Sequence, residues 1–148
     1  MKIAVDTNVL IYAHVARFPE HERARTWIYQ QLDQADVTLV TTPMILSEMV
    51  HVITDPRRFE PPVQVQEALE IARNWIGRSN VECLATGEEA AAITFDLMDR
   101  HGLGRHRLAD SMLVATMLVH DVTVLATRNT RDFSIFSQIR LIDPIISQ

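Results

Sequence analysis

The sequence predicts an α/β fold in which helices cover both faces of a mainly parallel sheet. Short apolar segments rich in β-branched residues alternate with longer segments of helical periodicity, as expected for parallel strands joined by helices. The strand segments are apolar on both faces, which is typical of a sheet buried on both sides. Apolar residues make up 47% of the 148 residues, and no repeat, low-complexity tract or linker interrupts them. We therefore expect one domain that spans residues 1–148.

Five segments have the length and composition of short buried strands. Each is apolar or β-branched over most of its length, and the first ends at an acidic residue, Asp6. The predicted strands are residues 2–6, 37–41, 81–84, 122–126 and 139–142.

The segments between these strands carry helical spacing and helix boundary residues. Pro43 stands where a helix begins, and Gly77 and Gly102 stand where helices end. The predicted helices are residues 9–13 with Thr7 and Asn8 as capping types, 20–34, 44–54, 63–76, a helix that opens at 86–89 and ends before Gly102, and 107–120. Residues 54–62 are a turn-rich connection and residues 127–133 a loop.

Composition excludes several classes of protein. No apolar run reaches the length of a membrane span, and the chain meets Asp6 too early for a signal peptide. The single cysteine, Cys83, excludes an internal disulfide and a cysteine-rich zinc site. We expect a soluble protein of the reducing cytoplasm. The net charge of −5 argues against indiscriminate binding to nucleic acid, although acidic metal ligands would themselves contribute to it.

Two acidic residues follow predicted strands, where ligands bind in such sheets. Asp6 comes after the first strand, and Asp132 lies in the loop after the strand 122–126. Each has a structural alternative: Asp6 could cap the next helix, and Asp132 could close a turn.

Two further acids lie in helices that are apolar nearly all round. Such helices are mostly buried, and a buried carboxylate is costly unless it is paired or bound to metal. Glu48 could instead form a narrow solvent-facing stripe with Ser47 and His51. Asp110 stands in the first turn of its helix, where the helix dipole favours an anion.

The joint placement of these four acids predicts a metal site. Several carboxylates that converge on one point do not all stay ionised without a cation. Ligands that are all oxygens suit Mg²⁺ or Mn²⁺ rather than zinc, and the histidines are too scattered for a zinc pattern. The chain has one lysine, Lys2, and its remaining positive charges are arginines, several of which flank these acids. Arginines beside Asp110 and Asp132 favour a phosphate substrate, with solvated loop arginines as the alternative.

The assembled motifs resemble the PIN-domain family, and within it the VapC-type ribonuclease toxins of prokaryotic toxin–antitoxin modules. Each motif is short, but they stand in the family's order and cover essentially the whole chain. The resemblance is carried by Val5-Asp6-Thr7-Asn8-Val9-Leu10, Ser47-Glu48, the segments 108–115 and 124–133, and more weakly by Thr54-Asp55-Pro56-Arg57 and Leu141-Ile142-Asp143-Pro144.

The resemblance implies a three-layer α/β/α sandwich and metal-dependent cleavage of RNA by a single acidic site. The implied catalytic and metal-binding residues are Asp6, Glu48, Asp110 and Asp132. The fourth acid stands at either of two places in the family; Asn129 occupies the first here, so Asp132 is the prediction. The predicted substrate-binding residues are Asn8, Arg107, Thr127, Arg128, Asn129 and Arg131. The family further implies a cognate antitoxin and a homodimer.

These residues predict hydrolysis by an activated water, which leaves a 5′-phosphate and needs no 2′-hydroxyl. An aspartyl-phosphate enzyme or receiver is the first alternative, but the one lysine, Lys2, lies at the far end of the first strand, roughly 13 Å from Asp6. The second alternative is a PIN-like module that binds a partner without cutting. The presence of all four acids argues against that module.

Overall fold

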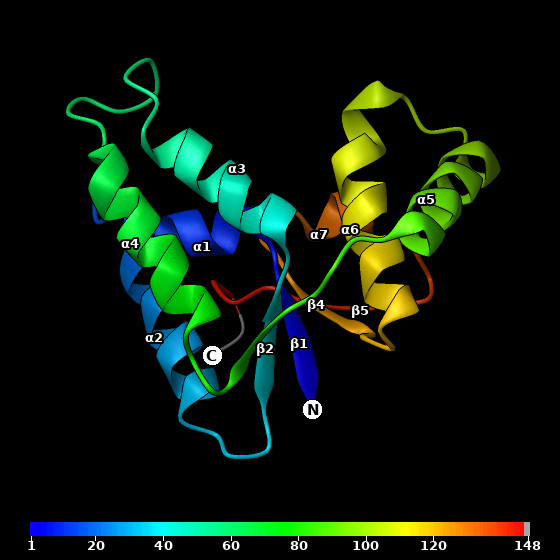
Figure 1. Cartoon of the computed structure of the whole chain (residues 1–148), viewed down its shortest axis with the longest axis horizontal. Helices are drawn as coiled ribbons and strands as arrows, with labels where there is room; N and C mark the ends of the chain where they lie inside the picture. Colours follow the sequence, from blue (N-terminus) through cyan, green and yellow to red (C-terminus); the bar gives the residue numbers. More distant parts are fainter. Residues whose placement is uncertain (147–148) are drawn as a thin grey trace.

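The computed structural model describes residues 1–146 and contains a five-stranded sheet in which every neighbouring pair is parallel (Figure 1). The strand order is β3-β2-β1-β4-β5, so the first strand of the chain is the central one. The strands are β1 (Lys2–Val5), β2 (Thr38–Thr41), β3 (Val81–Cys83), β4 (Val124–Ala126) and β5 (Arg140–Ile142). The predicted parallel sheet is confirmed, with each strand a residue or two shorter than its apolar segment.

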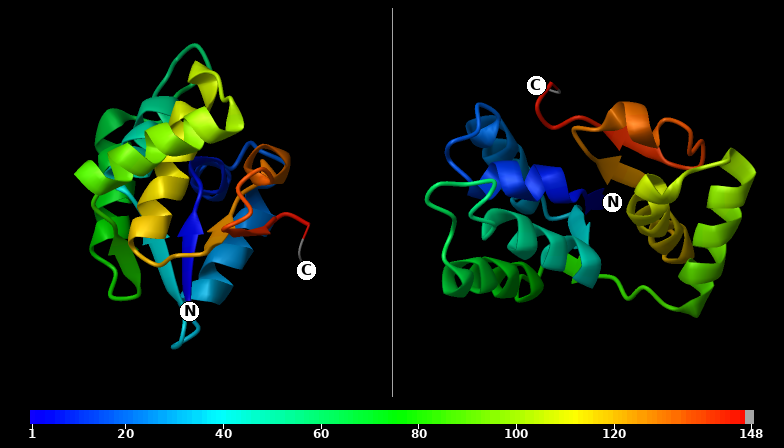
Figure 2. Two further views of the ribbon diagram at one scale, coloured as in Figure 1. Left: turned by 90° about the vertical axis from the view of Figure 1, so that its right-hand side faces the viewer. Right: turned by 90° about the horizontal axis from the view of Figure 1, so that it is seen from above.

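Helices cover the sheet from two sides, which confirms the predicted three-layer α/β/α arrangement. The helices α1 to α4 gather on one side, and α5 and α6 pack together on the other (Figures 1 and 2). Their bounds are α1 (Thr7–His14), α2 (His21–Leu32), α3 (Pro43–Ile53), α4 (Val65–Ile76), α5 (Glu88–His101), α6 (Leu108–Val119) and α7 (Thr130–Phe133). A 3₁₀ turn, Arg105–Arg107, leads directly into α6.

A crevice lies at the carboxyl end of β1, and the residues that follow this strand form part of its lining. From β1 the chain moves through α1 and α2 to β2 on one side, whereas β4, the other neighbour of β1, is reached through helices on the opposite side. Where connections diverge in this way, the loops after neighbouring strands move apart and leave room for a ligand. The acidic residues near the carboxyl end of β1 are therefore the candidates for a ligand site.

The sheet is anchored in a continuous apolar core. Ile3, Ala4 and Val5 of β1 and Leu125 of β4 are essentially inaccessible to solvent, as expected for strands covered on both faces. Burial of this kind contributes roughly 25 cal/mol per Å² of apolar surface, so the central strands are part of what stabilises the fold.

Several predicted boundaries follow from local chemistry. The Thr42 hydroxyl accepts a hydrogen bond from the backbone N–H of Ile45 at 3.2 Å, and Pro43 occupies the first turn of α3. Gly102 ends α5 with φ of 59°, a left-handed conformation that disfavours side chains with a Cβ.

Two expectations were wrong. Residues 127–133 are not a plain loop, because they contain the four-residue helix α7. The helix around Glu48 is not buried all round: Ser47, Glu48 and His51 are exposed, as in the solvent-facing stripe considered as the alternative. Its buried apolar residues occupy one side, and the polar stripe faces solvent and the crevice.

Within residues 1–146 no helix is long and apolar enough to cross a membrane.

Candidate active site

The first residues of the site follow β1 and β4, which lie side by side. Val5 pairs with Ala126 in the sheet, and the backbone N–H of Asp6 donates to the carbonyl of Ala126 at 2.9 Å. This extension of the ladder brings Asp6 next to Thr127, although they are 121 positions apart in the chain. Asp6 also occupies the N-cap position of α1, but its side chain makes no capping hydrogen bond. Its carboxylate therefore serves the crevice and not the end of the helix.

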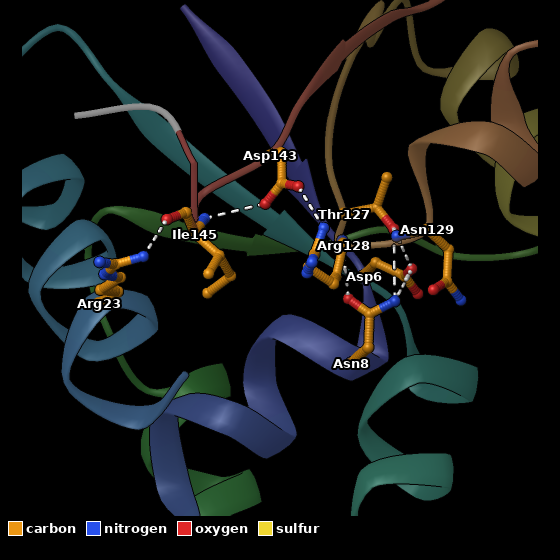
Figure 3. A network of polar contacts seen from close by, with 8 residues as sticks. All are labelled: Asp6, Asn8, Arg23, Thr127, Arg128, Asn129, Asp143 and Ile145. Atoms are coloured by element: carbon orange, nitrogen blue, oxygen red, sulfur yellow. Dashed lines mark hydrogen bonds and ion pairs between the residues drawn. The ribbon is translucent and has the colours of Figure 1, made fainter. Parts of the chain in front are cut away.

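A polar network fixes one oxygen of Asp6 (Figure 3). Asp6 Oδ2 accepts hydrogen bonds from Thr127 Oγ1 at 2.6 Å and from Asn8 Nδ2 at 2.7 Å. Thr127 Oγ1 in turn accepts from the backbone N–H of Asn129 at 3.0 Å, and Asn8 Oδ1 accepts from that of Arg128 at 3.2 Å. The two turns after β1 and β4 are thus joined around a single carboxylate oxygen.

Glu48 reaches the crevice from α3. Its Oε2 accepts a hydrogen bond of 2.7 Å from the hydroxyl of Thr7, a buried residue in the first turn of α1. Thr7 is consequently a positioning residue for Glu48. The contact also explains how an exposed glutamate can keep a defined position.

Asp110 approaches from the opposite side, in the first turn of α6. Arg107, one turn earlier, forms an ion pair of 3.0 Å from its Nε to Asp110 Oδ2. The same guanidinium lies 3.5 Å from Asp132 Oδ1 and also donates to the backbone carbonyl of Asp132. Arg107 therefore links the helix that carries Asp110 to α7, which carries Asp132.

These residues surround a cleft of about 200 Å³. Its polar lining comprises Asp6, Asn8, Glu48, Arg58, Asp110 and Asn129, with Thr7 beside Glu48. Three of the four predicted acids are brought together there. Asp132 is not part of the lining: its side chain is 53% exposed on the rim, and it is joined to the site through Arg107.

Burial and nearby negative charges raise the pKa of two carboxyl groups in the cleft. Burial raises the pKa of Asp6 to about 6, and the charges of Asp110 and Glu48 act in the same direction, while the Thr127 hydrogen bond opposes them. The pKa of Asp110 is also raised, chiefly by burial, and the positive charge of Arg107 opposes this shift. Both carboxylates thus carry a charge that the protein alone compensates incompletely.

The unused oxygens of the three acids provide a test of whether a cation fits. Asp6 Oδ2, Glu48 Oε2 and Asp110 Oδ2 are held by the protein, whereas the second oxygen of each accepts no hydrogen bond within residues 1–146. No three acidic, histidine or cysteine side chains of that part of the chain lie close enough to hold one ion directly. Magnesium is commonly bound by one or two carboxylates together with several waters, so this arrangement fits it.

The predicted substrate-binding residues divide into two groups. Asn8 and Asn129 line the cleft, and Thr127 lies behind Asp6 as its hydrogen-bond donor. The predicted arginines do not line it: Arg107 pairs with Asp110, Arg128 forms an ion pair of 2.8 Å with Asp143, and Arg131 is exposed on α7. Their substrate-binding role remains a prediction.

The arginine that the structure brings into the cleft is Arg58, which sequence reasoning assigned no role. It lies in the turn-rich connection after α3, a segment whose direction the sequence pattern does not determine. The available signal was the pair Arg57-Arg58, nine and ten residues beyond Glu48. A cleft that joins free carboxylate oxygens to one guanidinium can hold a hard cation and a phosphate together.

Comparison with known proteins agrees with this architecture. A model of the PIN domain matches residues 3–139. Ribonuclease VapC33 of Mycobacterium tuberculosis (strain CDC 1551 / Oshkosh) is 27% identical over 143 residues, which cover 97% of this chain and 98% of the relative. Ribonuclease VapC24 of the same strain is 29% identical over 145 residues, with 98% of each chain covered.

Solved structures share the fold. VapBC2 from Rickettsia felis, bound to a DNA fragment from its promoter, superposes with a TM-score of 0.68 at 17% identity, covering 96% of this chain and 98% of that one. Mycobacterium tuberculosis VapC20, described as a sarcin-ricin loop cleaving toxin, gives a TM-score of 0.70 at 14% identity, with 90% and 95% covered. Because the family model extends from β1 to the residue before β5, this protein belongs to the PIN-domain family.

Proposed function

We propose that this PIN-domain protein is a metal-dependent endoribonuclease, the toxin of a VapC-like toxin–antitoxin pair. The observation that carries the proposal is the group of three carboxylates, each with one oxygen held and one free, around a cleft at the switch point of the sheet. The full-length likeness to relatives named VapC ribonucleases supports the same activity.

The proposed cofactor is Mg²⁺ or Mn²⁺, with Asp6 and Asp110 as principal ligands. Glu48 completes the cluster from α3, and Asp132 from the rim, through its ion pair with Arg107. When bound, the ion would activate a water and offset the charge that develops on the scissile phosphate.

The chain's own residues prepare this chemistry. Thr127 and Asn8 restrain one oxygen of Asp6, Thr7 restrains Glu48, and Arg107 restrains Asp110, so the unused oxygens are preorganised. Arg58 offers guanidinium donors to a phosphate in the same cleft. Among residues 1–146, the cleft lining contains no serine, cysteine, histidine or lysine, and its carboxylates are the groups assigned to the ion, which favours direct attack by water.

We further propose RNA as substrate, a cognate antitoxin protein that blocks the cleft, a homodimeric assembly and action in the cytoplasm, where such RNA is found. The proposed antitoxin is supported by the toxin–antitoxin complexes among the structural neighbours.

Cleavage of total RNA by the purified protein tests the activity, with Mg²⁺ or Mn²⁺ against EDTA and with Asp110→Asn as control. Discrete fragments that require metal, carry 5′-phosphates and vanish in the control are the expected result. Fragments that end in 2′,3′-cyclic phosphates would refute attack by water. No cleavage by metal-loaded, antitoxin-free protein would point to a PIN-like module that binds without cutting.

A further inference from the structure

A second groove adjoins the catalytic cleft and has no assigned role. It encloses about 440 Å³, within the roughly 300–1,000 Å³ usual for ligand sites, and shares Asn8, Ile11, Val52 and Arg58 with the cleft. Its remaining lining is aromatic and basic. We call it the aromatic groove, after Tyr12, Arg17, Phe18, Arg58 and Phe59. Because the two hollows share one wall, the groove lies where a chain bound in the cleft would continue.

Three rings support the groove by edge-to-face packing. The centroids of Tyr12 and Phe18 are 5.0 Å apart with planes at 77°, and those of Phe18 and Phe59 are 5.8 Å apart at 86°. Phe59 is buried, whereas Tyr12 and Phe18 are half-buried and keep part of their surface open to the groove. The rings therefore hold one another in place and still present apolar surface to a ligand.

Two arginines, Arg17 and Arg58, line the groove. The Arg17 guanidinium lies 5.3 Å from the centroid of Phe59 and donates to the Pro61 carbonyl at 3.0 Å; within residues 1–146 it has no carboxylate partner. Arg58 is 3.7 Å from Asp55, a carboxylate that Arg57 holds more closely at 3.1 Å. Arginine has five N–H donors, so both side chains keep donors for an anion. By contrast, Arg107 and Arg128, near the cleft, are paired with acids at 3.0 Å and 2.8 Å.

We propose that the aromatic groove binds the nucleotide next to the scissile phosphate of a single-stranded RNA, which rests on the proposed function. The base of this nucleotide packs against Tyr12 and Phe18. The phosphates on either side of the nucleotide contact Arg58, where the cleft meets the groove, and Arg17 beyond it. Bases within a duplex are stacked on their neighbours and are not free to reach such rings, which is why the occupant is single-stranded. Stacking accepts every base, so the groove contributes affinity and register rather than sequence preference.

The test uses steady-state cleavage of a fluorescent single-stranded RNA of roughly ten nucleotides that carries a cleavage site of the wild type. Phe18→Leu removes a ring but keeps apolar packing, and Arg17→Gln removes an exposed charge. We expect KM to rise about 5- to 100-fold for Phe18→Leu, the range for loss of one stacked base, with kcat nearly unchanged. For Arg17→Gln the slope of log KM against log salt should fall by about 0.7, the value of one single-strand phosphate contact.

Tyr29→Leu and Arg73→Gln are matched controls, because they change an exposed ring on α2 and an exposed arginine on α4, away from the groove. An RNA whose flanking nucleotide lacks its base should bind the wild type more weakly than the intact RNA does. Phe18→Leu should bind the two RNAs equally well.

An equal loss of binding to the abasic RNA by both proteins, or variants with wild-type KM, would overturn the proposal. So would variants with unchanged KM that escape inhibition by the cognate antitoxin, since the groove would then hold protein. If Phe18→Leu does not fold, the salt dependence of Arg17→Gln decides alone. A wild type that cuts no RNA would instead refute the proposed function.

Discussion

Thr127 is wholly inaccessible to solvent, yet its hydroxyl group serves three neighbours. It donates to Asp6 Oδ2 and accepts from Asn8 Nδ2 at 3.3 Å and from the Asn129 backbone at 3.0 Å. At residue scale the candidate site therefore depends on a hydroxyl that solvent does not reach. In the proposed metal site, a partner of this kind would orient the ligand Asp6.

We expect Thr127→Val to lower cleavage by about 10- to 100-fold, the usual cost of losing a partner of a metal ligand. Valine has the same shape, but it leaves Asp6 Oδ2 with one donor and the Asn129 N–H without its acceptor. Thr127→Ser keeps the hydroxyl and should retain most of the activity. Kinetics at saturating Mn²⁺ for both variants provide the measurement; equal activity of the two would contradict the role assigned to the hydroxyl.

Asp132 offers a second test at this scale. Because it lies outside the cleft lining and pairs with Arg107, we expect Asp132→Asn to lower cleavage by about 10- to 100-fold, as a partner of a ligand does. Asp6→Asn should abolish cleavage and leave the fold intact. Comparing the cleavage rates of Asp132→Asn and Asn129→Ala identifies which of the two residues is the fourth member of the proposed site. If Asp132→Asn were as inactive as Asp6→Asn, Asp132 would be a direct ligand.

The sequence alone predicted most of the charged residues that line this cleft and missed one of them. Asp6 and Asp110 could be placed because strand ends and helix starts around a switch point are fixed by the fold. Glu48 was also placed there, although the burial expected for it was wrong. Arg58 could not be placed, because it lies in an irregular connection whose path depends on tertiary contacts.

At element scale, helix ends provide the clearest link between sequence and conformation. Gly102 has φ of 59°, whereas Gly104, two residues later, has φ of −78°. Neither has a heavy atom within 4 Å of where a Cβ would be, so the two glycines differ in backbone conformation and not in available space. They form a natural matched pair.

We expect Gly102→Ala to destabilise the protein by about 1 kcal/mol, because a left-handed backbone disfavours a side chain. Gly104→Ala should be neutral or stabilising by up to about 1 kcal/mol, because its φ suits any residue and alanine restricts the unfolded chain. Urea unfolding of both variants measures the difference. Equal effects would contradict the conformational argument.

A hydrogen bond between elements makes stability depend on pH. Trp75 Nε1 of α4 donates to His14 Nε2 of α1 at 2.9 Å, which requires an unprotonated ring nitrogen. Burial, followed by the charges of Arg78, His21 and Arg25, lowers the pKa of His14 to about 4, from 6.5 in the unfolded chain. Between these values the unfolded chain takes up a proton before the folded one does. The contribution of His14 to stability is therefore full above pH 6.5 and is lost as the pH falls towards 4.

The expected loss for the wild type is on the order of 1 kcal/mol, or about 2–4 °C in Tm, because solvent screens the exposed part of the ring. His14→Gln keeps an acceptor for Trp75 but does not titrate, so its Tm should fall less between pH 7 and pH 5. Thermal melts at both values, with His51→Gln as an exposed control, test this. Parallel curves for wild type and His14→Gln would count against it.

Elements were predictable where periodicity was long and the boundary residues were distinctive. Pro43 and Gly102 marked helix ends that the structure confirms. The helix α7 was missed because four residues are about one turn, too short to show a periodic pattern, and its position depends on packing of the buried Phe133.

At the scale of the whole molecule, the proposed metal site would connect ion binding to folding. A cation that binds the folded state alone stabilises it by about 2.7 kcal/mol at one hundred times its Kd. We expect saturating Mn²⁺ to raise the Tm of the wild type by about 5–10 °C over that in EDTA. Asp6→Asn should lose most of this shift, and Glu22→Gln, exposed on α2, should keep it. An undiminished shift in Asp6→Asn would place the ion elsewhere.

The central position of β1 also determines when the site can exist during translation. Of the five strands, β1 is synthesised first and β4, its neighbour on one side, much later, so Asp6 meets Thr127 only after 121 further residues have been added. At about 5–20 residues per second, several seconds or more separate the synthesis of the two residues. A nascent chain that ends between them lacks the assembled site and, under the proposed activity, does not cleave the messenger from which it is being translated.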